Sequence, residues 1–386
     1  MKILVVCPRI PAKNKNGDQV LSYHRLCHLA KSHNVHILCF SFDGDNSDKR
    51  SLELLGIVVH QVPWRLIYAI WFSWKALFND AIPFQCAFYT SISFQKLFSA
   101  VIRNFEPDIL YSVTIRTIPN IIDFKEPLYV DLVDSMGLNF ERRSNAAHGL
   151  KKFFFKIEAK RALSFERSLA LKVKKSFLVS ALDKEYIGLP NIVVLPLGID
   201  FCNFFPNPQF TRDPVIVFSG NMFYSPNIEA VLWFIRWCWQ AIKLNVPGVK
   251  LVIVGSNPAP SIKKLELDAR IKVTGRVESM AKVLNSSQVA IAPMQSGSGM
   301  QFKVLEAMAC SVPVVATTVG LGGIGAVPGR DILIGDTPED FIRLVVKLLK
   351  DPIYRLSIAE AGCEYALKNN QWNVINKIFS FECDLL

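Results

Sequence analysis

Short apolar runs alternate with longer amphipathic segments along the first half of the chain. Apolar runs bounded by turn residues predict strands, and segments such as 18–32, with apolar residues at helical spacing, predict helices. Regular alternation of the two indicates a doubly wound parallel sheet. The strands expected here are Ile3–Cys7, Val35–Phe40, Val58–Val62, Ile109–Ser112, Leu128–Val130, Ser176–Val179 and Ile192–Leu195.

The same alternation continues in the second half and is clearest between Ala292 and Thr317. An apolar run ends at Pro293, the small residues 297–299 follow, a helical segment reaches Ala309, and a second apolar run covers 312–316. This order predicts a strand, a glycine turn, a helix and a parallel strand. Glycines at the start of a helix let anionic groups approach its free N–H groups. The turn is therefore a candidate anion site.

Two charged residues follow that turn on one face of the expected helix, because Lys303 and Glu306 are three positions apart. A cation suits a phosphate, and a carboxylate accepts hydrogen bonds from two sugar hydroxyls. A nucleotide-diphosphate sugar satisfies both. The alternative is an ordinary strand-helix-strand unit with a surface lysine and glutamate.

The sequence 303–309, Lys-Val-Leu-Glu-Ala-Met-Ala, and the Pro-Val-Val at 313–315 carry a family resemblance. They resemble the donor motif of GT-B glycosyltransferases of family 4 (glycosyltransferase group 1), which retain anomeric configuration. The similarity is closest to sugar transferases of bacterial exopolysaccharide clusters. Ser298 stands where that family has the first acid of its Glu-x7-Glu signature. The resemblance implies an α/β fold of two Rossmann-like, doubly wound parallel-sheet domains facing a cleft.

Length also favours two domains, since 386 residues with 51% hydrophobic side chains exceed one domain of usual size. The segment 195–200 resembles the approach to the interdomain linker of the family. We therefore expect an acceptor-binding domain at 1–200, joined by a C-terminal helix at about 369–386. A linker at 201–213 and a nucleotide-sugar-binding domain at 214–368 complete the division.

The resemblance assigns most donor contacts to the second domain. The string at 215–227 is similar to the Gly-x-Met-x-Tyr-x-Pro-Asn string of the exopolysaccharide subgroup, and the segment 271–277 matches the place where the family holds the base. Arg276 is expected either to stack on the base or to face solvent. The expected donor-binding residues are Gly220, Asn221, Gly275, Arg276, Gly297, Ser298, Gly299, Met300 and Glu306, with Lys303 as the cation that stabilises the leaving diphosphate.

Two strand ends of the first domain carry polar residues. Gly17, Asp18 and Arg25 follow the first strand and resemble the subgroup's residues on the acceptor and phosphate side; Asp18 is alternatively a helix N-cap. Asp131 and Asp134 end another strand, where they are placed to hold hydroxyls, and Asp134 or Ser135 is alternatively a helix N-cap. Lys303, Asp134 and Asp18 are the expected catalytic residues. Glu158 and Glu166 are expected to form salt bridges within their own helix.

The net charge of +11 is concentrated in one segment, since residues 142–175 hold eleven basic and two acidic side chains. Three phenylalanines at 153–155 lie within it, and the stretch 64–78 is also aromatic, apolar and basic. Such segments predict contact with an anionic membrane surface, and a solvated helix is the alternative. The stretch 64–78 is too short to span a bilayer. No nucleic-acid-binding signature accompanies the basic charge, so nucleic acid is not an expected partner.

Nine cysteines show no Cys-x-x-Cys pair, which indicates free thiols in a reducing compartment and no structural metal. Asp43 and Asp45 resemble a metal-binding Asp-x-Asp, but their polar neighbours favour an exposed turn. The apolar run at the N-terminus is too short for a signal peptide. We therefore expect a cytoplasmic protein at the inner face of the plasma membrane, with no metal and no cofactor beyond the nucleotide-sugar co-substrate.

These patterns together predict a metal-independent, retaining glycosyltransferase. It would move a sugar from a nucleotide-diphosphate donor to a lipid-linked or polysaccharide acceptor in bacterial cell-surface glycan synthesis. No clear protein nucleophile is apparent, which suits a mechanism in which the departing phosphate takes the acceptor's proton. The alternatives are a sugar-nucleotide epimerase of the same fold and a non-catalytic, membrane-associated subunit that binds sugar nucleotides.

Overall fold

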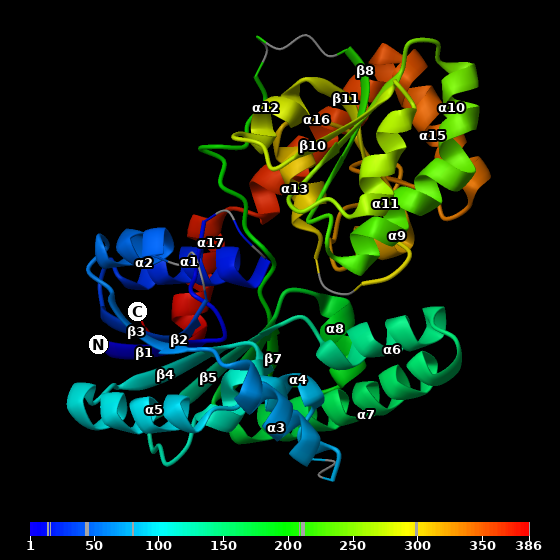
Figure 1. The fold of residues 1–386 in the computed structure, drawn as a ribbon. Helices are drawn as coiled ribbons and strands as arrows, with labels where there is room; N and C mark the ends of the chain where they lie inside the picture. Colours follow the sequence, from blue (N-terminus) through cyan, green and yellow to red (C-terminus); the bar gives the residue numbers. More distant parts are fainter. Residues whose placement is uncertain are drawn as a thin grey trace. The chain divides into compact units, whose positions relative to one another are not determined.

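A computed structural model describes residues 1–13, 15, 17–42, 46–78, 81–207, 209, 213–297 and 300–385. The chain divides into two compact units, each with its own parallel sheet (Figure 1). Unit 1 comprises Met1–Leu195 and Asn373–Leu386, and unit 2 comprises Pro196–Trp372. The boundary expected after Asp200 and the segment expected as a linker thus fall within unit 2.

Unit 1 contains seven strands in its described part, in the order β3-β2-β1-β4-β5-β6-β7, and every neighbouring pair is parallel. The strands are β1 Lys2–Cys7, β2 Asn34–Ser41, β3 Val58–Pro63, β4 Ile109–Val113, β5 Leu128–Val133, β6 Lys175–Leu178 and β7 Ile192–Val194. The helices are α1 Gly17–Leu29, α2 Asn46–Glu53, α3 Leu66–Ala76, α4 Phe84–Phe88, α5 Ile92–Phe105, η1 Ile115–Asn120, α6 Met136–Ala146, α7 Gly149–Lys172, α8 Ala181–Ile187 and α17 Trp372–Glu382.

The two faces of this sheet are covered by separate hydrophobic clusters, as the two-residue period of a strand requires. On β1, Leu4 and Val6 belong to one cluster, and Ile3 and Val5 belong to the other. The second cluster includes Phe379 of α17, whose ring lies 5.0 Å from that of Tyr111 and packs edge to face. The last helix of the chain is therefore part of the core of unit 1.

Unit 2 contains six strands in its described part, in the order β10-β9-β8-β11-β12-β13, again all parallel. The strands are β8 Asp213–Ser219, β9 Lys250–Val254, β10 Ile271–Gly275, β11 Ser287–Ala292, β12 Val314–Ala316 and β13 Leu333–Ile334. The helices are α9 Ser225–Phe234, η2 Ile235–Trp239, α10 Gln240–Asn245, α11 Pro260–Lys263, η3 Lys264–Leu267, α12 Met280–Asn285, α13 Phe302–Ala309, α14 Thr318–Leu321, α15 Pro338–Lys350 and α16 Pro352–Asn369.

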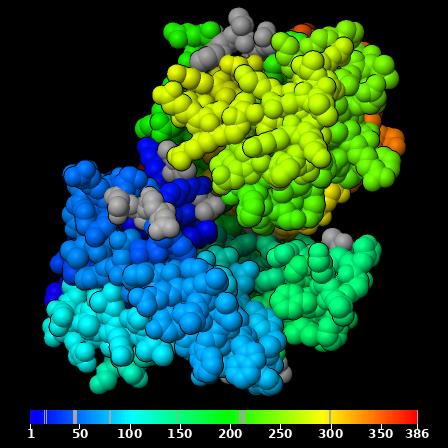
Figure 2. Space-filling view, in the orientation of Figure 1, coloured from blue at the N-terminus to red at the C-terminus, as the bar shows by residue number. Residues whose placement is uncertain are grey.

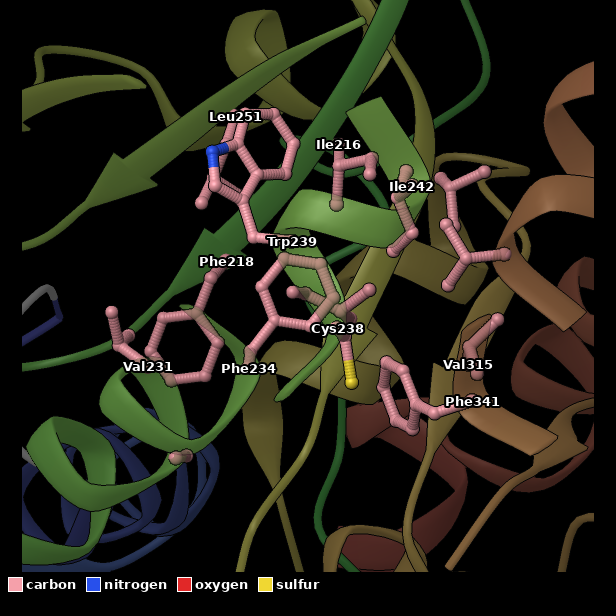
Figure 3. Close-up of a cluster of buried hydrophobic side chains, with 14 of the residues drawn as sticks. Ile216, Phe218, Val231, Phe234, Cys238, Trp239, Ile242, Leu251, Val315 and Phe341 are labelled. Carbon is pink, nitrogen blue, oxygen red and sulfur yellow. The ribbon is translucent and has the colours of Figure 1, made fainter. Parts of the chain in front are cut away.

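The core of unit 2 centres on aromatic side chains from two helices. Phe234 ends α9 and meets Phe341 of α15 with ring centroids 5.9 Å apart, while the buried Cys238 lies between the same elements (Figure 3). The segment η2 is a π-helical turn that continues α9 into α10. It places Trp239 in the core with its ring N–H donated to Asp268 Oδ2 at 2.9 Å, so the indole is buried and satisfied.

Both sheets confirm the predicted α/β class with parallel strands, and both reverse their strand order at one place. In unit 1 the order reverses between β1 and β4, and in unit 2 it reverses between β8 and β11. Loops after two such strands leave the sheet in opposite directions, which opens a crevice at their carboxyl ends where ligands bind in open α/β sheets.

Candidate functional site

The carboxyl edge of the unit 2 sheet is lined by glycine backbone. Gly220 follows β8, Gly255 follows β9 and Gly275 ends β10. Gly220 N–H donates to Val254 O at 2.9 Å, and Gly255 N–H donates to Gly275 O at 3.0 Å. A Cβ atom on Gly255 would lie 1.6 Å from the carbonyl oxygen of Gly220, so no side chain fits there. A ligand at this edge meets main chain directly.

Helix α13 begins beside this edge, and Lys303 in its first turn points into unit 2. Its ammonium donates to Asn227 Oδ1 at 2.6 Å, lies 3.5 Å from Met294 Sδ, and sits 4.5 Å from the centre of the Phe218 ring. Gln301, the residue before the helix, makes no side-chain cap. The first N–H groups of α13 are therefore not satisfied by the side chain of that residue, and a cation lies next to them.

Asn227, the hydrogen-bond partner of Lys303, was not predicted to be a site residue from the sequence motifs. It is buried near the start of α9, accepts from Lys303 and donates through Nδ2 to Asn221 O at 3.0 Å. A Cβ on Gly220 would come within 2.7 Å of this amide, so the glycine leaves room for it. Asn227 thus links the loop after β8 to Lys303 of α13 through hydrogen bonds. Its position in the motif at 215–227 was the one feature of the sequence that could have identified it as a site residue.

The charges of Lys303 and Glu306 are both destabilised by their surroundings. Removal from water lowers the pKa of Lys303 to about 7, and the Glu306 carboxylate opposes this shift. Removal from water also raises the pKa of Glu306 to about 7, and Lys303 opposes that shift. Both side chains therefore have a pKa near neutral pH, and strongly shifted pKa values of desolvated groups are often found at functional sites.

The other residues expected to contact a donor are placed as follows. Arg276 is exposed, directly after β10, and Asn221 accepts the N–H of Phe223 through its side chain at 3.0 Å. Met300 is buried, with its sulfur accepting from Leu197 N–H at 3.3 Å. Gly297 has a φ of 125°, a conformation that favours glycine. Ser298 and Gly299 lie outside the described residues.

In unit 1, Asp18 lies in the first turn of α1, which begins at Gly17. Its carboxylate accepts two hydrogen bonds from one nitrogen of Arg9, at 2.6 and 2.7 Å, and lies 3.9 Å from Arg116. Arg9 follows β1 and Arg116 follows β4, the two neighbouring strands at which the order reverses. Two arginines that the sequence analysis had not selected thus accompany Asp18.

Arg25 and Asp131 are buried in unit 1 rather than placed on an accessible acceptor side. Arg25 is fully buried, donates to Asn376 Oδ1 at 2.6 Å and lies 4.5 Å from the Phe379 ring centre. Asp131 lies 4.0 Å from Arg25 and accepts from Tyr111 at 3.0 Å. Burial raises the pKa of Asp131, and the Arg25 charge opposes that rise. In this structure the two side chains hold α17 against the sheet.

Asp134 lies beside two buried acids at the start of α6. Glu166 accepts from Ser135 Oγ at 2.9 Å and from Met136 N–H at 2.6 Å, and Asp183 accepts from Ser135 N–H at 3.1 Å. Burial raises the pKa of Glu166 to about 8 and that of Asp183 to about 6. Glu166 therefore caps α6 instead of forming the in-helix salt bridge expected from sequence, and of the two N-cap candidates it is Ser135 that takes the N-cap position.

Nothing in the described part of the chain groups three or more His, Cys, Asp or Glu side chains around a common metal position. The Asp43 and Asp45 pair lies outside the described residues. All nine cysteines are free thiols. No helix in the described segments is both long and apolar enough to cross a bilayer.

Residues 213–351, most of unit 2, match the family model described as glycosyl transferases group 1. A curated relative from Klebsiella pneumoniae, described as an uncharacterized 44.6 kDa protein in the cps region, is 23% identical over 50% of this chain. A protein of Corynebacterium glutamicum, described as a GDP-mannose-dependent monoacylated alpha-(1-6)-phosphatidylinositol monomannoside mannosyltransferase, is 29% identical over 34% of this chain. The matches span 54% and 38% of those two proteins.

Two solved structures share the fold over nearly the whole chain. Anabaena Alr3699/HepE, in complex with UDP and glucose, aligns with a TM-score of 0.70 and 15% identity over 100% of both chains. Sucrose-phosphate synthase of Thermosynechococcus elongatus aligns with a TM-score of 0.71 and 14% identity over 98% of both chains. The chain therefore has the GT-B fold, and its residues 213–351 form a glycosyl transferases group 1 domain.

Proposed function

We propose that the chain is a retaining, metal-independent glycosyltransferase that binds a nucleotide-diphosphate sugar in unit 2 and glycosylates an acceptor bound by unit 1. The observation that carries the proposal is the desolvated ammonium of Lys303, held by Asn227 beside the start of α13 and the glycine-lined edge of the sheet. The match to the group 1 family and the UDP complexes of a protein with the same fold support it.

In this proposal the diphosphate lies against the first N–H groups of α13, where the helix dipole and Lys303 both favour negative charge. Glu306, one turn further on, accepts hydroxyls of the sugar. The base lies against the backbone of Gly220 and Gly275, beside Arg276. Charge builds up on the diphosphate as the glycosidic bond breaks, so a preorganised cation lowers the barrier. Desolvation strengthens that interaction.

Asp18 and Asp134 lie at the carboxyl edge of the unit 1 sheet and are the proposed contacts for acceptor hydroxyls. The acceptor oxygen forms the new bond to the anomeric carbon, the bond from that carbon to the diphosphate breaks, and the acceptor's proton passes to the departing phosphate oxygen. Retention of configuration follows from attack on the face that the diphosphate leaves. Neither the formation of the new bond nor the transfer of the proton requires a nucleophile from the protein.

A surface of unit 1 supports a membrane-linked acceptor (Figure 2, light blue and green). Helix α3 exposes one continuous apolar face, with Ile67 71% and Phe78, just after the helix, 78% exposed. The start of α7 exposes Leu150 and Phe153 beside the basic residues of 151–160. Large exposed apolar faces flanked by cations suit the boundary of an anionic bilayer. Attachment to the inner face of the plasma membrane, in surface-glycan synthesis, is the proposed setting, in keeping with the cps-region relative.

The test has two parts. A thermal-shift screen with UDP-, GDP-, dTDP- and CMP-sugars identifies the donor, since a ligand at 100 times its Kd stabilises the folded state by about 2.7 kcal/mol. The selected donor is then incubated with a panel of lipid-linked and oligosaccharide acceptors, and products are analysed for transfer and anomeric configuration. Transfer with retention is expected. Conversion of the donor without acceptor indicates an epimerase, and binding without turnover indicates a non-catalytic subunit.

A further inference from the structure

A pocket of about 490 Å³ lies in unit 1, and it is polar at one end and aromatic at the other. Arg9 and Arg116 line it from the ends of β1 and β4. Its aromatic lining comes from α4 and α7, and consists of Phe84, Phe88, Tyr89 and Phe154. The volume falls within the range of small-molecule sites. None of the donor-binding residues of unit 2 contributes to it.

The polar end contains two arginines beside one carboxylate. Asp18 accepts from Arg9 and lies 3.9 Å from Arg116. The side chains of Arg9 and Arg116 keep 28% and 24% of their surface exposed. Arg116 also donates through Nε to Gln85 Oε1 at 3.1 Å, which fixes the plane of its guanidinium. Fixed, partly exposed guanidinium groups are well suited to phosphate oxygens.

Strained backbone supports the position of Arg116. Thr114, two residues earlier, directly follows β4 and has a φ of 64°, which is rare for a β-branched residue, and its hydroxyl accepts the Arg116 N–H at 3.3 Å. Its own N–H donates to Asp131 O at 2.7 Å. Strain of this kind persists where surrounding contacts enforce it, and it is found preferentially at ligand sites.

The aromatic end is held together by contacts between α4 and α7. Phe84 stacks on Phe154 with ring centroids 5.5 Å apart, and the Arg161 guanidinium lies 4.8 Å from the Phe84 centre. Arg161 is buried and donates to the carbonyl oxygen of Ala76, the last residue of α3. These contacts make the aromatic lining a preformed surface, and they join it to the helix that exposes the apolar face.

Helix α3 itself reaches the pocket through Ser73. The neighbouring Trp71 and Trp74 are more than half exposed and stack on each other with centroids 6.0 Å apart. The pocket therefore adjoins the helix whose apolar face is exposed. A free sugar phosphate would leave the aromatic lining unused, and a purely apolar ligand would leave the arginines facing hydrocarbon.

We propose that this pocket binds a phosphate or diphosphate ester of an apolar chain, with the phosphate on Arg9 and Arg116 and the chain against Phe84, Phe88 and Phe154. The inference rests on the proposed function in one respect, since it identifies this ester as the lipid end of the acceptor. The pocket lies wholly in unit 1, so its ligand is measured separately from the donor.

Farnesyl diphosphate is the probe, and its binding to the full chain is followed by titration calorimetry in a non-ionic detergent below its critical concentration. Inorganic pyrophosphate, farnesol and dihexanoyl phosphatidic acid are the comparison ligands. We expect farnesyl diphosphate to bind at least about tenfold more tightly than pyrophosphate or farnesol, because only it engages both ends. If pyrophosphate binds as tightly as farnesyl diphosphate, the proposed contact of the apolar chain with the aromatic lining is overturned. If farnesol binds as tightly as farnesyl diphosphate, the proposed contact of the phosphate with the arginines is overturned. Tighter binding of the phosphatidic acid assigns the pocket to bilayer lipid and overturns the acceptor assignment.

Three variants at two positions test where the ligand binds. Arg116→Gln should weaken farnesyl diphosphate binding by about tenfold or more, and Arg116→Lys should restore part of the loss, because charge remains without the planar fork. Ser73→Trp should fill the pocket from α3 and weaken the same binding. Arg103→Gln, an exposed arginine of α5, is the matched control. Unchanged binding in both Arg116→Gln and Ser73→Trp overturns the proposal.

Donor binding separates this inference from the proposed function. Each variant should keep the thermal shift of wild type with the selected nucleotide sugar, which also shows that it is folded. If no nucleotide sugar binds while farnesyl diphosphate binding depends on Arg116, the proposed function fails and the pocket assignment holds. If the donor binds and the pocket variants leave farnesyl diphosphate binding unchanged, the pocket assignment fails alone.

Discussion

Donor affinity should depend on pH in a way that identifies Lys303. Desolvation lowers the pKa of this lysine to about 7 in the free protein, so half of the molecules carry the charge at pH 7. A diphosphate beside the ammonium favours its charged form and raises the pKa in the complex. Binding therefore takes up a proton above pH 7, and affinity should fall as pH rises.

The size of the effect follows from the two protonation states. At pH 8.5 about 3% of a group with a pKa of 7 is charged, so affinity should fall about 15-fold between pH 7 and 8.5, or roughly 1.6 kcal/mol. A lysine with its usual pKa near 10.4 would change affinity by only a few per cent over that range. The difference is large enough for calorimetry in matched buffers, where the number of protons taken up is measured independently.

Two substitutions separate the contributions of the pair. Lys303→Arg keeps the charge at every pH and should flatten the profile between pH 7 and 8.5. Glu306 also ionises near pH 7, and its carboxylate raises the pKa of Lys303; Glu306→Gln should therefore move the fall in affinity to lower pH. Lys350→Arg, at the exposed end of α15, is the matched control and should retain the wild-type profile. A flat wild-type profile would refute a diphosphate contact by a lysine whose pKa lies near 7.

Glu166 holds a proton in the folded state up to about pH 8, whereas the unfolded chain releases that proton near pH 4.3. The free energy of unfolding should therefore drop by up to about 3.5 kcal/mol between pH 5 and 8. Glu166→Gln should remove most of that drop in denaturant titrations; an unchanged slope would contradict the burial of a protonated acid. EDTA should leave transfer intact, as should alanine at both acids of the 43–45 segment, and loss of activity in either case favours a metal-dependent mechanism. The protein should bind phosphatidylglycerol vesicles more weakly as salt increases without losing binding entirely, and Lys151, Lys152 and Lys156 changed together to Glu should remove most of the salt-sensitive part. Absence of vesicle binding at low salt would leave the basic segment as a solvated face.

The sequence was sufficient for the fold class because the pattern of short apolar runs is a local property. The apolar runs at 3–7 and 249–254 lie in strands of two parallel sheets, and the helix after residue 300 bears Lys303 and Glu306 as spacing requires. Glycines at strand ends were also readable, since few other residues suit those positions.

Contacts between distant residues were not readable in this way. Lys303 and Asn227 are 76 positions apart, and Arg25 meets Asn376 across 351 positions, so spacing gives no sign of either pair. Arg25 was placed on the acceptor and phosphate side by the resemblance to the exopolysaccharide subgroup, and the residues around it in the sequence give no sign that its side chain is buried. Glu166 was assigned to its own helix because i,i+4 partners are visible in a sequence, whereas the N-terminus of α6 as its partner is not.

The contact between Gly220 and Gly255 has a consequence for changing the specificity of the protein. Where main chain forms one wall of a site, referred to here as its floor, the site selects its ligand by shape and by fixed N–H and C=O groups. A point mutation cannot replace these backbone groups. A Cβ at Gly255 would collide with the neighbouring carbonyl oxygen, so substitution there breaks the floor instead of altering it. Attempts to redesign donor preference should therefore leave the glycines intact and vary Arg276 and Asn221, whose side chains border that floor.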